Sequence, residues 1–306
     1  MERKIIRQGS GGYTVYLPKK WVTQKGLKEG DLIGVEESKN SLVFSTEVRK
    51  RKEKLFKINP DNREDIEVIL THLYRRGFDA IHLEGLDKEF HKRVKKIVEE
   101  LLLGFEITSK TDTRCTIENI SEPTGQKYEA LLLKVFLIIK EVQDLVIEDF
   151  ESGKFQNLDE IRESKRNGDK FILFCRRILT KEKQELDATI EWEMLTFLMH
   201  INHAYFYLYE YLKENRIQDK KEILSLLNSL KEYFMLYEKA YTEKNILYIH
   251  KINADKKKYQ FGKCIEALTN GRGKMNPALS YIRELFRLVQ IGASPILIQI
   301  IEKDYK

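Results

Sequence analysis

The sequence predicts a multidomain protein with a small β-rich segment at its N-terminus, a small α+β domain, and an all-α C-terminal region made of a pair of three-helix bundles. Two observations predict this order. Along the 306 residues the hydrophobic pattern changes from short β-branched and aromatic runs to apolar positions three and four apart. From residue 124 to 304 proline and glycine are sparse and helix-forming residues dominate. The composition, 42% hydrophobic and 33% charged, indicates packed cores and argues against a disordered chain.

Residues 1–48 are expected to form short strands around one short helix. β-branched and aromatic residues predict strands over 4–7, 13–16, 32–36 and 42–45. Pro18 suits the first turn of a helix, which we expect from Lys19 to Lys25, with its end at Gly26. A segment of fewer than about 50 residues needs disulfides, metal or a partner chain to fold, and this one has neither of the first two patterns. We therefore expect a homodimer through the N-terminal domain.

A basic linker is expected over 49–56, and an α+β domain over 57–121. Helices are predicted after Pro60-Asp61 up to Gly77 and from Asp87 to Leu103, and Gly77 and Gly104 end them. Strands are predicted over 78–83, 105–110 and 115–120. The residues of this domain predict no chemistry.

Six long helices are expected in the C-terminal region, because breaks fall near Gly153, Thr180, Asn215, Thr242 and Asn270. Short links between long helices favour two antiparallel three-helix bundles, over 124–214 and 219–304. Their similar lengths suggest an internal duplication. The dense aromatic series in the third helix, from Tyr205 to Tyr211, is interpreted chiefly as core packing.

Several classes of protein are excluded. No run of 18 apolar residues is present, so no membrane insertion is expected, and the first residues lack the apolar core of a signal peptide. The three cysteines, Cys115, Cys175 and Cys264, have no paired spacing, which favours a reducing compartment and core positions. We therefore expect a cytoplasmic protein.

The net charge of +6 lies entirely in the first 56 residues, which hold 13 Lys/Arg and 7 Asp/Glu, while the remaining 250 residues balance. A dimer doubles this basic surface, which favours a nucleic-acid partner. The candidate DNA-binding residues are Arg3, Lys4, Arg7, Lys19, Lys20, Arg49, Lys50, Arg51 and Lys52. The basic run at 49–52 also has a simpler interpretation as a solvated linker, and the basic segment could also bind acidic protein.

The first segment resembles the SpoVT–AbrB DNA-binding domain. The resemblance rests on the strand, the glycine turn and the Pro18-Lys19-Lys20-Trp21 helix start over 9–21, followed by the pattern over 27–33 that contains Gly30-Asp31. It covers about 45 residues and implies a swapped-hairpin β barrel, built from two chains, that binds duplex DNA. The size argument above predicts a dimer independently.

The order of the three parts resembles the archaeal AbrB-fused members of the PhoU (phosphate uptake regulator) family. Weaker motifs in the bundles at 161–170, 200–204 and 282–293 support this resemblance. It implies carboxylate-bound metal clusters on the bundles, but the sequence departs from that pattern. Lys165 replaces the first acid of a pair and Asp169 keeps the second; Asn202 replaces an Asp beside a retained His203; Ala293 replaces another Asp; and only Asp255 remains near 251–255.

We expect no cofactor and at most weak metal binding at these remnants, because a lysine in a ligand position adds repulsion to the loss of a ligand. His200 and His203 are spaced as a metal pair, but the interpretation as two structural bundle histidines is preferred. The basic turn at 271–274 lacks P-loop spacing and no nucleophile motif is present, so no enzyme activity is expected.

The resulting hypothesis is a non-enzymatic, DNA-binding transcriptional regulator in phosphate homeostasis whose helical body senses or docks a partner. Two alternatives remain. One is a protein-interaction regulator of a phosphate transporter or signalling protein, such as a sensor kinase, in which the basic segment only dimerises. The other is a metal-dependent hydrolase built on the helical bundle.

Overall fold

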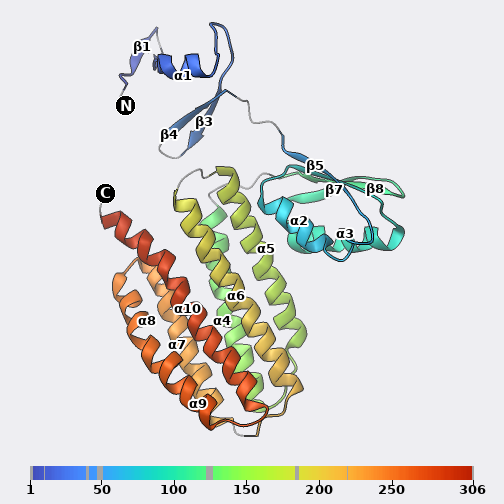
Figure 1. Cartoon of the computed structure of the whole chain (residues 1–306), viewed down its shortest axis with the longest axis vertical. Coiled ribbons are helices and arrows are strands. Elements are labelled where there is room, and N and C mark those ends of the chain that lie inside the picture. The colour runs from blue at the N-terminus through green and yellow to red at the C-terminus, as the bar shows by residue number, and fades with distance from the viewer. Residues whose placement is uncertain are drawn as a thin grey trace. The chain divides into compact units, whose positions relative to one another are not determined.

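The computed structural model describes residues 3–9, 11–38, 41–46, 51–121, 127–182, 186–218 and 220–304. The chain divides into two compact units, Met1–Arg51 (unit 1) and Lys52–Lys306 (unit 2). Most of the described residues are helical, and the sheets are small (Figure 1). The coarse prediction, β structure followed by α+β structure and then helices, agrees with this arrangement.

The described residues of unit 1 form two antiparallel hairpins and one short helix. Strand β1 (Ile6–Gln8) pairs with β2 (Gly12–Thr14), and β3 (Gly34–Ser38) pairs with β4 (Ser41–Ser45). Helix α1 (Lys19–Gln24) lies between them in sequence and begins after Pro18, as predicted. Gly26, with φ of +67°, follows this helix in the left-handed region that glycine adopts without steric cost. The two hairpins are separate sheets, so the described residues of one chain form no closed barrel.

The first part of unit 2 is a four-stranded sheet in the order β5-β6-β8-β7. Its elements are β5 (Glu53–Lys57), α2 (Ile66–Arg75), β6 (Ala80–Glu84), α3 (Lys88–Leu101), β7 (Phe105–Lys110) and β8 (Arg114–Asn119). Strands β5 and β6 are parallel and joined through α2, and the other pairs are antiparallel. Helices α2 and α3 lie along the sheet and both contact α5 (Figure 1).

The predicted linker over 49–56 needs correction, because residues 53–57 form strand β5 and pair in parallel with β6. Phe56 is partly buried against the core. The lysines at 52 and 54 concealed this edge strand, since one hydrophobic side chain facing the core is a weak signal in a basic run. Residues 49 and 50 lie outside the described residues.

Over the described residues from 127 onward, the chain forms a helical region of six consecutive stretches, which is compatible with the predicted all-α region. They are α4 (Tyr128–Ser152), α5 (Leu158–Glu182), α6 (Leu186–Glu214), α7 (Lys221–Glu243), a fifth stretch, and α10 (Met275–Asp304). The fifth is interrupted: α8 (Ile246–Lys258) passes through a π-helical turn at Tyr259–Lys263 into α9 (Cys264–Asn270). Helices α6 and α10 pack together more extensively than any other pair, and α4 also contacts α7.

One continuous hydrophobic core runs through unit 2, from the sheet and its helices into all of the long helices. Cys115, Cys175 and Cys264 are free and buried in it, as predicted. Tyr205 and Tyr209 of the aromatic series are buried, whereas Tyr207 is exposed. The α+β part and the two halves of the bundle therefore share one core.

Helix α10 is long and apolar enough over Met275–Glu302 to cross a membrane, but half of the most apolar part is buried in the structure. It packs against α6, α7 and α8, and Ile282, Leu285, Phe286 and Val289 are fully buried. These contacts are typical of the core helix of a soluble protein.

Candidate functional site

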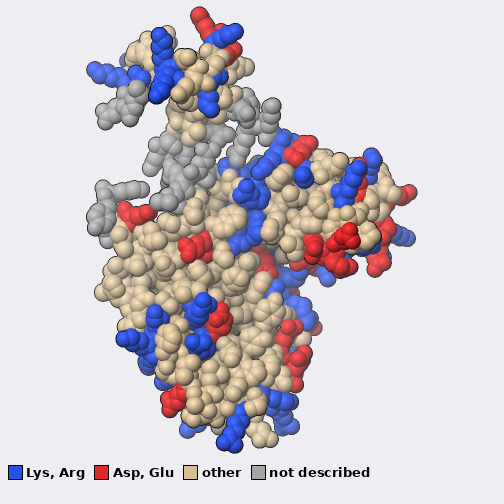
Figure 2. Space-filling model, viewed as in Figure 1, with Lys and Arg blue, Asp and Glu red and all other residues tan. Residues whose placement is uncertain are grey.

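Five of the predicted DNA-binding residues lie on two neighbouring stretches of unit 1. Arg3, Lys4 and Arg7 lie on or just before β1, and Lys19 and Lys20 form the first turn of α1. All five side chains are exposed. Figure 2 shows Lys and Arg side chains gathered on the visible face of this unit. Arg51 is also exposed, and Arg49 and Lys50 lie outside the described residues.

Lys52 differs from its predicted role as a free basic side chain. Its Nζ donates to the carbonyl of Arg76 at 2.9 Å, and the ammonium lies 4.6 Å from the centre of the Phe78 ring. Its backbone N–H donates to Asp79. These contacts engage Lys52 within unit 2, although its side chain is exposed, and its role in DNA binding stays a prediction.

The surface of unit 1 is apolar as well as basic. None of the side chains that the structure describes in this unit is buried. Leu32 is 86% exposed, Tyr13 72% and Tyr16 68%. The remaining large hydrophobic side chains exposed here are Ile5, Ile6, Val15, Val35 and Leu42. Soluble monomers rarely leave so many large apolar groups uncovered in so short a segment.

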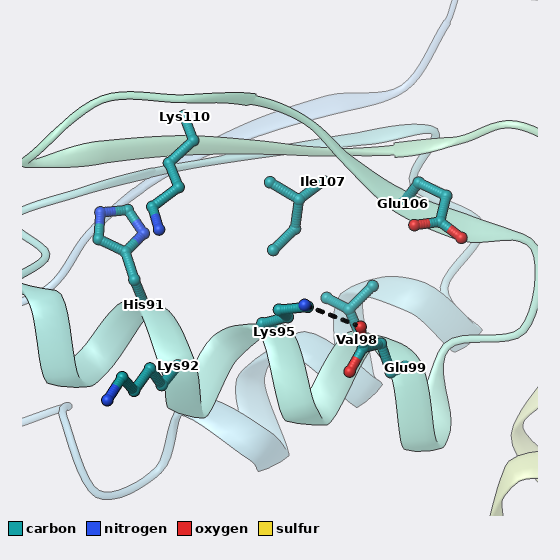
Figure 3. A pocket seen from close by; sticks show the side chains of 8 residues that line it. All are labelled: His91, Lys92, Lys95, Val98, Glu99, Glu106, Ile107 and Lys110. Atoms are coloured by element: carbon teal, nitrogen blue, oxygen red, sulfur yellow. Dashed lines mark ion pairs between the residues drawn. The ribbon is translucent and has the colours of Figure 1, made fainter.

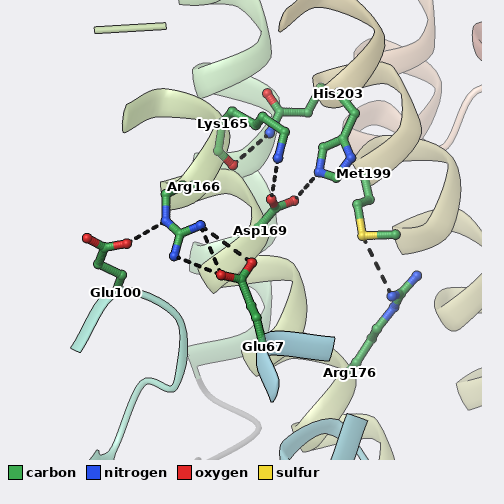
Figure 4. A network of polar contacts seen from close by, with 9 residues as sticks. Glu67, Glu100, Lys165, Arg166, Asp169, Arg176, Met199 and His203 are labelled. Atoms are coloured by element: carbon green, nitrogen blue, oxygen red, sulfur yellow. Dashed lines mark hydrogen bonds and ion pairs between the residues drawn. The ribbon is translucent and has the colours of Figure 1, made fainter. Parts of the chain in front are cut away.

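The bundle positions singled out from the sequence meet between α5 and α6. Asp169 accepts from the Lys165 ammonium at 3.2 Å and pairs with His203 Nε2 at 2.6 Å (Figure 4). The three side chains are only 15–25% exposed. Asp169 is therefore already paired with two protein groups.

Asn202 lies beside this cluster and is buried. Its side-chain N–H donates to the carbonyl of Lys165 at 3.1 Å, linking α6 to the backbone of α5. The absence of a side chain at Gly168 allows this approach, because a Cβ there would lie 2.4 Å from Asn202 Nδ2. Asn202 is thus a packing residue between the helices.

The other two positions are not part of this cluster. Ala293 is buried in α10 with 1% of its surface exposed, and Asp255 lies on α8. His200 and His203 do not converge either, since His203 faces Asp169 and His200 is exposed. Partial burial of the otherwise exposed His200 side chain, and then the nearby His203 and Arg176, lower the pKa of His200.

These residues do not fit a carboxylate-bound metal cluster. Hard divalent cations need several oxygen ligands, and here one carboxylate is shared between an ammonium and an imidazole. Within the described residues no group of three or more His, Cys, Asp and Glu side chains could hold a metal. The expectation of at most weak metal binding stays a prediction, which metal analysis of the purified protein tests.

Sequence reasoning missed the polar contacts that join this part of α5 to the α+β part. Arg166 Nε lies 2.6 Å from Glu100 of α3, and its terminal nitrogens are 3.4 Å from Glu67 of α2 (Figure 4). Arg166 is adjacent to Lys165 in the chain. In the sequence Arg166 is part of a charged stretch, and such a stretch does not indicate which distant residues its side chains contact.

A second junction lies further along α5. Arg177 is fully buried, donates to the carbonyls of Tyr74 and Phe78, and lies 3.3 Å from Asp79. Lys181 also pairs with Asp79. Burial alone raises the pKa of Asp79, but hydrogen bonds from Lys181 and Lys52 and the nearby positive charges outweigh it and lower the pKa.

Arg176 is buried without a carboxylate partner among the described residues. Its guanidinium donates to Thr196 Oγ1 at 2.7 Å and lies 5.1 Å from the Trp192 ring. Burial, reinforced by the charge of Arg75, lowers the pKa of Arg176 to about 10. Its contacts to Trp192 and Thr196 fix α5 against α6.

Comparison with known proteins identifies no relative: no family model, curated protein or solved structure matches the chain.

Proposed function

We propose that the protein is a dimeric DNA-binding regulator in which two copies of unit 1 form the DNA-binding surface. Unit 2 serves as the sensing or docking body. The resemblance of the domain order to AbrB-fused phosphate uptake regulators supports a role in phosphate homeostasis in the cytoplasm. The exposed apolar surface of unit 1, together with its basic side chains, is the observation that carries the proposal.

The dimer follows from the stability of small β structures. An isolated two-stranded hairpin is at best marginally stable in water, and unit 1 contains two of them. Covering Leu32, Tyr13 and Tyr16 with the same residues of a second copy supplies a core that one chain lacks. The swapped-hairpin barrel implied by the family resemblance is one architecture that achieves this.

DNA as the partner follows from the charge of that dimer. Unit 1 has 11 Lys/Arg and 6 Asp/Glu, so pairing two copies concentrates about ten positive charges on one small body. Lys19 and Lys20 lie at the start of α1, and their exposed ammonium groups can meet phosphate. Arg3 and Arg7 are the residue type best suited to read guanine edges.

The proposal predicts salt-sensitive binding that depends on unit 1. Mobility shifts of the full chain on duplex DNA, repeated across salt concentrations, measure the slope of log K against log salt. Each phosphate contact contributes about −0.9 to this slope. The double variant Lys19→Gln/Lys20→Gln removes up to four contacts per dimer, so its slope should be shallower by up to about 3.6.

The matched control is Lys251→Gln/Lys257→Gln, which removes the same charge from exposed positions of α8. It should bind DNA as the wild type does. Failure of any duplex to shift, even at low salt, would contradict the proposal. If the protein were still dimeric in that case, unit 1 would act as a dimeriser of a protein-interaction regulator.

A further inference from the structure

Helix α8, the π-helical turn and α9 present a continuous row of exposed side chains, which we name the outer line. Its members follow one another at alternating steps of four and three residues, the spacing that keeps side chains on one face of a helix. The outer line consists of Leu247, Lys251, Ala254, Lys258, Phe261 and Ile265, and all six are exposed. The DNA-binding proposal makes no use of this face.

The π-helical turn holds Phe261 on the outside of the helical region. The neighbouring Gln260 is buried, and its side-chain N–H donates to the carbonyl of Phe286 at 3.3 Å. The Gln260 carbonyl accepts from Arg283 Nε at 3.2 Å, so the turn is fastened to α10 twice. Phe261 itself is 58% exposed. A large aromatic ring is therefore displayed to solvent from a firmly held piece of backbone.

The apolar character extends to both ends of the outer line. Leu247, at the start of α8, is 67% exposed, and Ile265, in α9, is 39% exposed. Three large apolar side chains thus project from one face over a stretch of 19 residues. Exposed apolar groups gathered in this way mark an interaction surface more often than a bare surface.

Positive charge surrounds these apolar side chains, although the body as a whole is neutral. Residues 244–274 hold eight Lys/Arg and two Asp/Glu, whereas residues 57–306 balance. Lys251, Lys257 and Lys263 are exposed and have no ion pair in the described part of the chain. Figure 2 shows Lys and Arg side chains on the part of the visible face where Figure 1 places α8. The charge of this face is complementary to a negatively charged partner.

The arrangement of the outer line suits a lipid bilayer. The hollows between α3 and β7 (Figure 3) and at the start of α10 are lined by other residues, so neither offers the outer line a groove. Protruding side chains enter the boundary of a bilayer wherever they stand, and a lysine stem lets the ammonium stay among the headgroups. Duplex DNA matches the lysines but offers no apolar surface along its phosphates to Phe261 and Leu247.

We propose that the outer line and its flanking lysines dock unit 2 on the surface of an anionic membrane, with α8 parallel to the bilayer plane. Leu247, Phe261 and Ile265 enter the boundary between headgroups and acyl chains, and the lysines contact the headgroup phosphates. No segment of the chain crosses the bilayer in this arrangement. Unit 2 thereby has a lipid partner on a surface separate from the one proposed to bind DNA.

The test is co-sedimentation of the full chain with vesicles. The anionic probe is phosphatidylcholine containing about 30% phosphatidylglycerol, and pure phosphatidylcholine is the uncharged comparison. The wild type should sediment with the anionic vesicles and remain in the supernatant with the uncharged ones.

Two variants separate the contributions of charge and apolar contact. Lys251→Gln/Lys257→Gln should weaken binding to anionic vesicles by at least about tenfold, because each lysine near an anionic surface contributes about fivefold. Phe261→Ser should weaken it by at least about fivefold, because the ring no longer enters the apolar boundary. All three side chains are exposed, so the variants should fold normally.

Matched controls change the same kinds of side chain elsewhere on unit 2. Lys95→Gln/Lys96→Gln removes two charges from α3, where the side chains are 67% and 72% exposed. Val68→Ser removes an apolar side chain that is 55% exposed on α2. Both should bind anionic vesicles as the wild type does.

Four results would overturn the proposal. Equal binding to the two kinds of vesicle, or unchanged binding in Lys251→Gln/Lys257→Gln, would remove the charge contact. Wild-type binding in Phe261→Ser would leave charge attraction alone, as toward an acidic protein. An equal loss in Lys19→Gln/Lys20→Gln would place the lipid contact on unit 1 instead.

Discussion

Asp169 shows how a single side chain is committed by its neighbours. Lys165 precedes it by one helical turn and His203 faces it from α6, so its carboxylate is paired on both sides. An ammonium held at i−4 carries a permanent positive charge at the place where a cation would otherwise bind. The contacts from Lys165 and His203 thereby occupy the carboxylate oxygens that a metal ion would need.

Substitution of Gly168, next to this cluster, by alanine is expected to change stability in the direction opposite to the usual one for a helical glycine. Alanine in place of glycine inside an exposed helix normally stabilises by about 0.5–1 kcal/mol. Here the added Cβ would lie 2.4 Å from Asn202 Nδ2, and Asn202 is buried. We expect Gly168→Ala to destabilise the protein by about 1–3 kcal/mol, because α5 and α6 must move apart. Thermal unfolding of the full chain measures the change.

The double variant Gly168→Ala/Asn202→Ala is the control for this mechanism. Shortening residue 202 removes the clashing amide, so the second substitution should recover part of the loss and the two effects should not add. Additive losses would indicate that contact with Asn202 is not the cause.

Residue identity predicted this cluster only in part. The family resemblance singled out Lys165, Asp169, Asn202 and His203 as altered positions of a metal site, but it did not predict their contacts with one another. It could not show that Arg166 reaches Glu67 and Glu100, about 100 and 66 positions earlier in the chain, since such pairs depend on how the helices pack.

At the level of elements, helix α5 fastens the α+β part to the bundle. Arg166 pairs with Glu67 of α2 and Glu100 of α3. Arg177 and Lys181 pair with Asp79, which directly precedes β6. Arg177 is fully buried, so its charge depends on Asp79 and two backbone carbonyls for compensation. Removal of the Asp79 charge leaves the buried guanidinium without this carboxylate and with the neutral carbonyls of Tyr74 and Phe78.

Asp79→Asn should therefore lower stability by about 1–3 kcal/mol at neutral pH, a value reduced for the partial exposure of Asp79. The folded pKa of Asp79 is lowered, so its charge stabilises the protein above the ordinary carboxyl pKa of about 3.9. That contribution is lost as the pH falls through the folded pKa. Unfolding measured between pH 3 and 7 should show a steeper acid loss in the wild type than in Asp79→Asn.

Asp144→Asn is the matched control at this scale. Asp144 pairs with Lys231 between α4 and α7, but it is 56% exposed, so its loss should cost less than about 0.5 kcal/mol. An equal loss in both variants would contradict a special role for the buried junction.

Helices were predicted more completely than strands. Periodic apolar positions over 20 or more residues identify α4 to α7 and α10, and the ends at Gly153, Asn215 and Asn270 agree with the structure. Strand β5 was missed because five residues with a single core-facing side chain resemble a basic linker. The π-helical turn at Tyr259–Lys263, where Tyr259 stacks on Phe286 of α10, was also unpredicted, since contacts between distant helices are not visible in the sequence.

At the scale of the whole molecule, the two units use their residues in opposite ways. Unit 2 buries one continuous core and carries balanced charge, whereas unit 1 leaves its apolar side chains exposed and carries the excess of positive charge. The sequence predicted both properties from segment length and charge. A surface that is apolar and basic at once is suited to pairing with a copy of itself on one face and with phosphate on another.

Leu32 provides the sharpest test of that pairing, because it is the most exposed large apolar side chain of unit 1 at 86%. Burying one leucine contributes about 1.5–3 kcal/mol, and a symmetric dimer buries two. Leu32→Glu removes both and places two like charges in the interface. We expect its dimer dissociation constant to rise by at least about 100-fold in sedimentation of the full chain. DNA affinity should fall with it, because a monomer carries half of the basic surface.

Leu247→Glu, which changes a leucine that is 67% exposed on α8, should remain dimeric and bind DNA normally. A wild-type chain that sediments as a monomer, or a Leu32→Glu variant that dimerises like the wild type, would exclude unit 1 as the dimer interface.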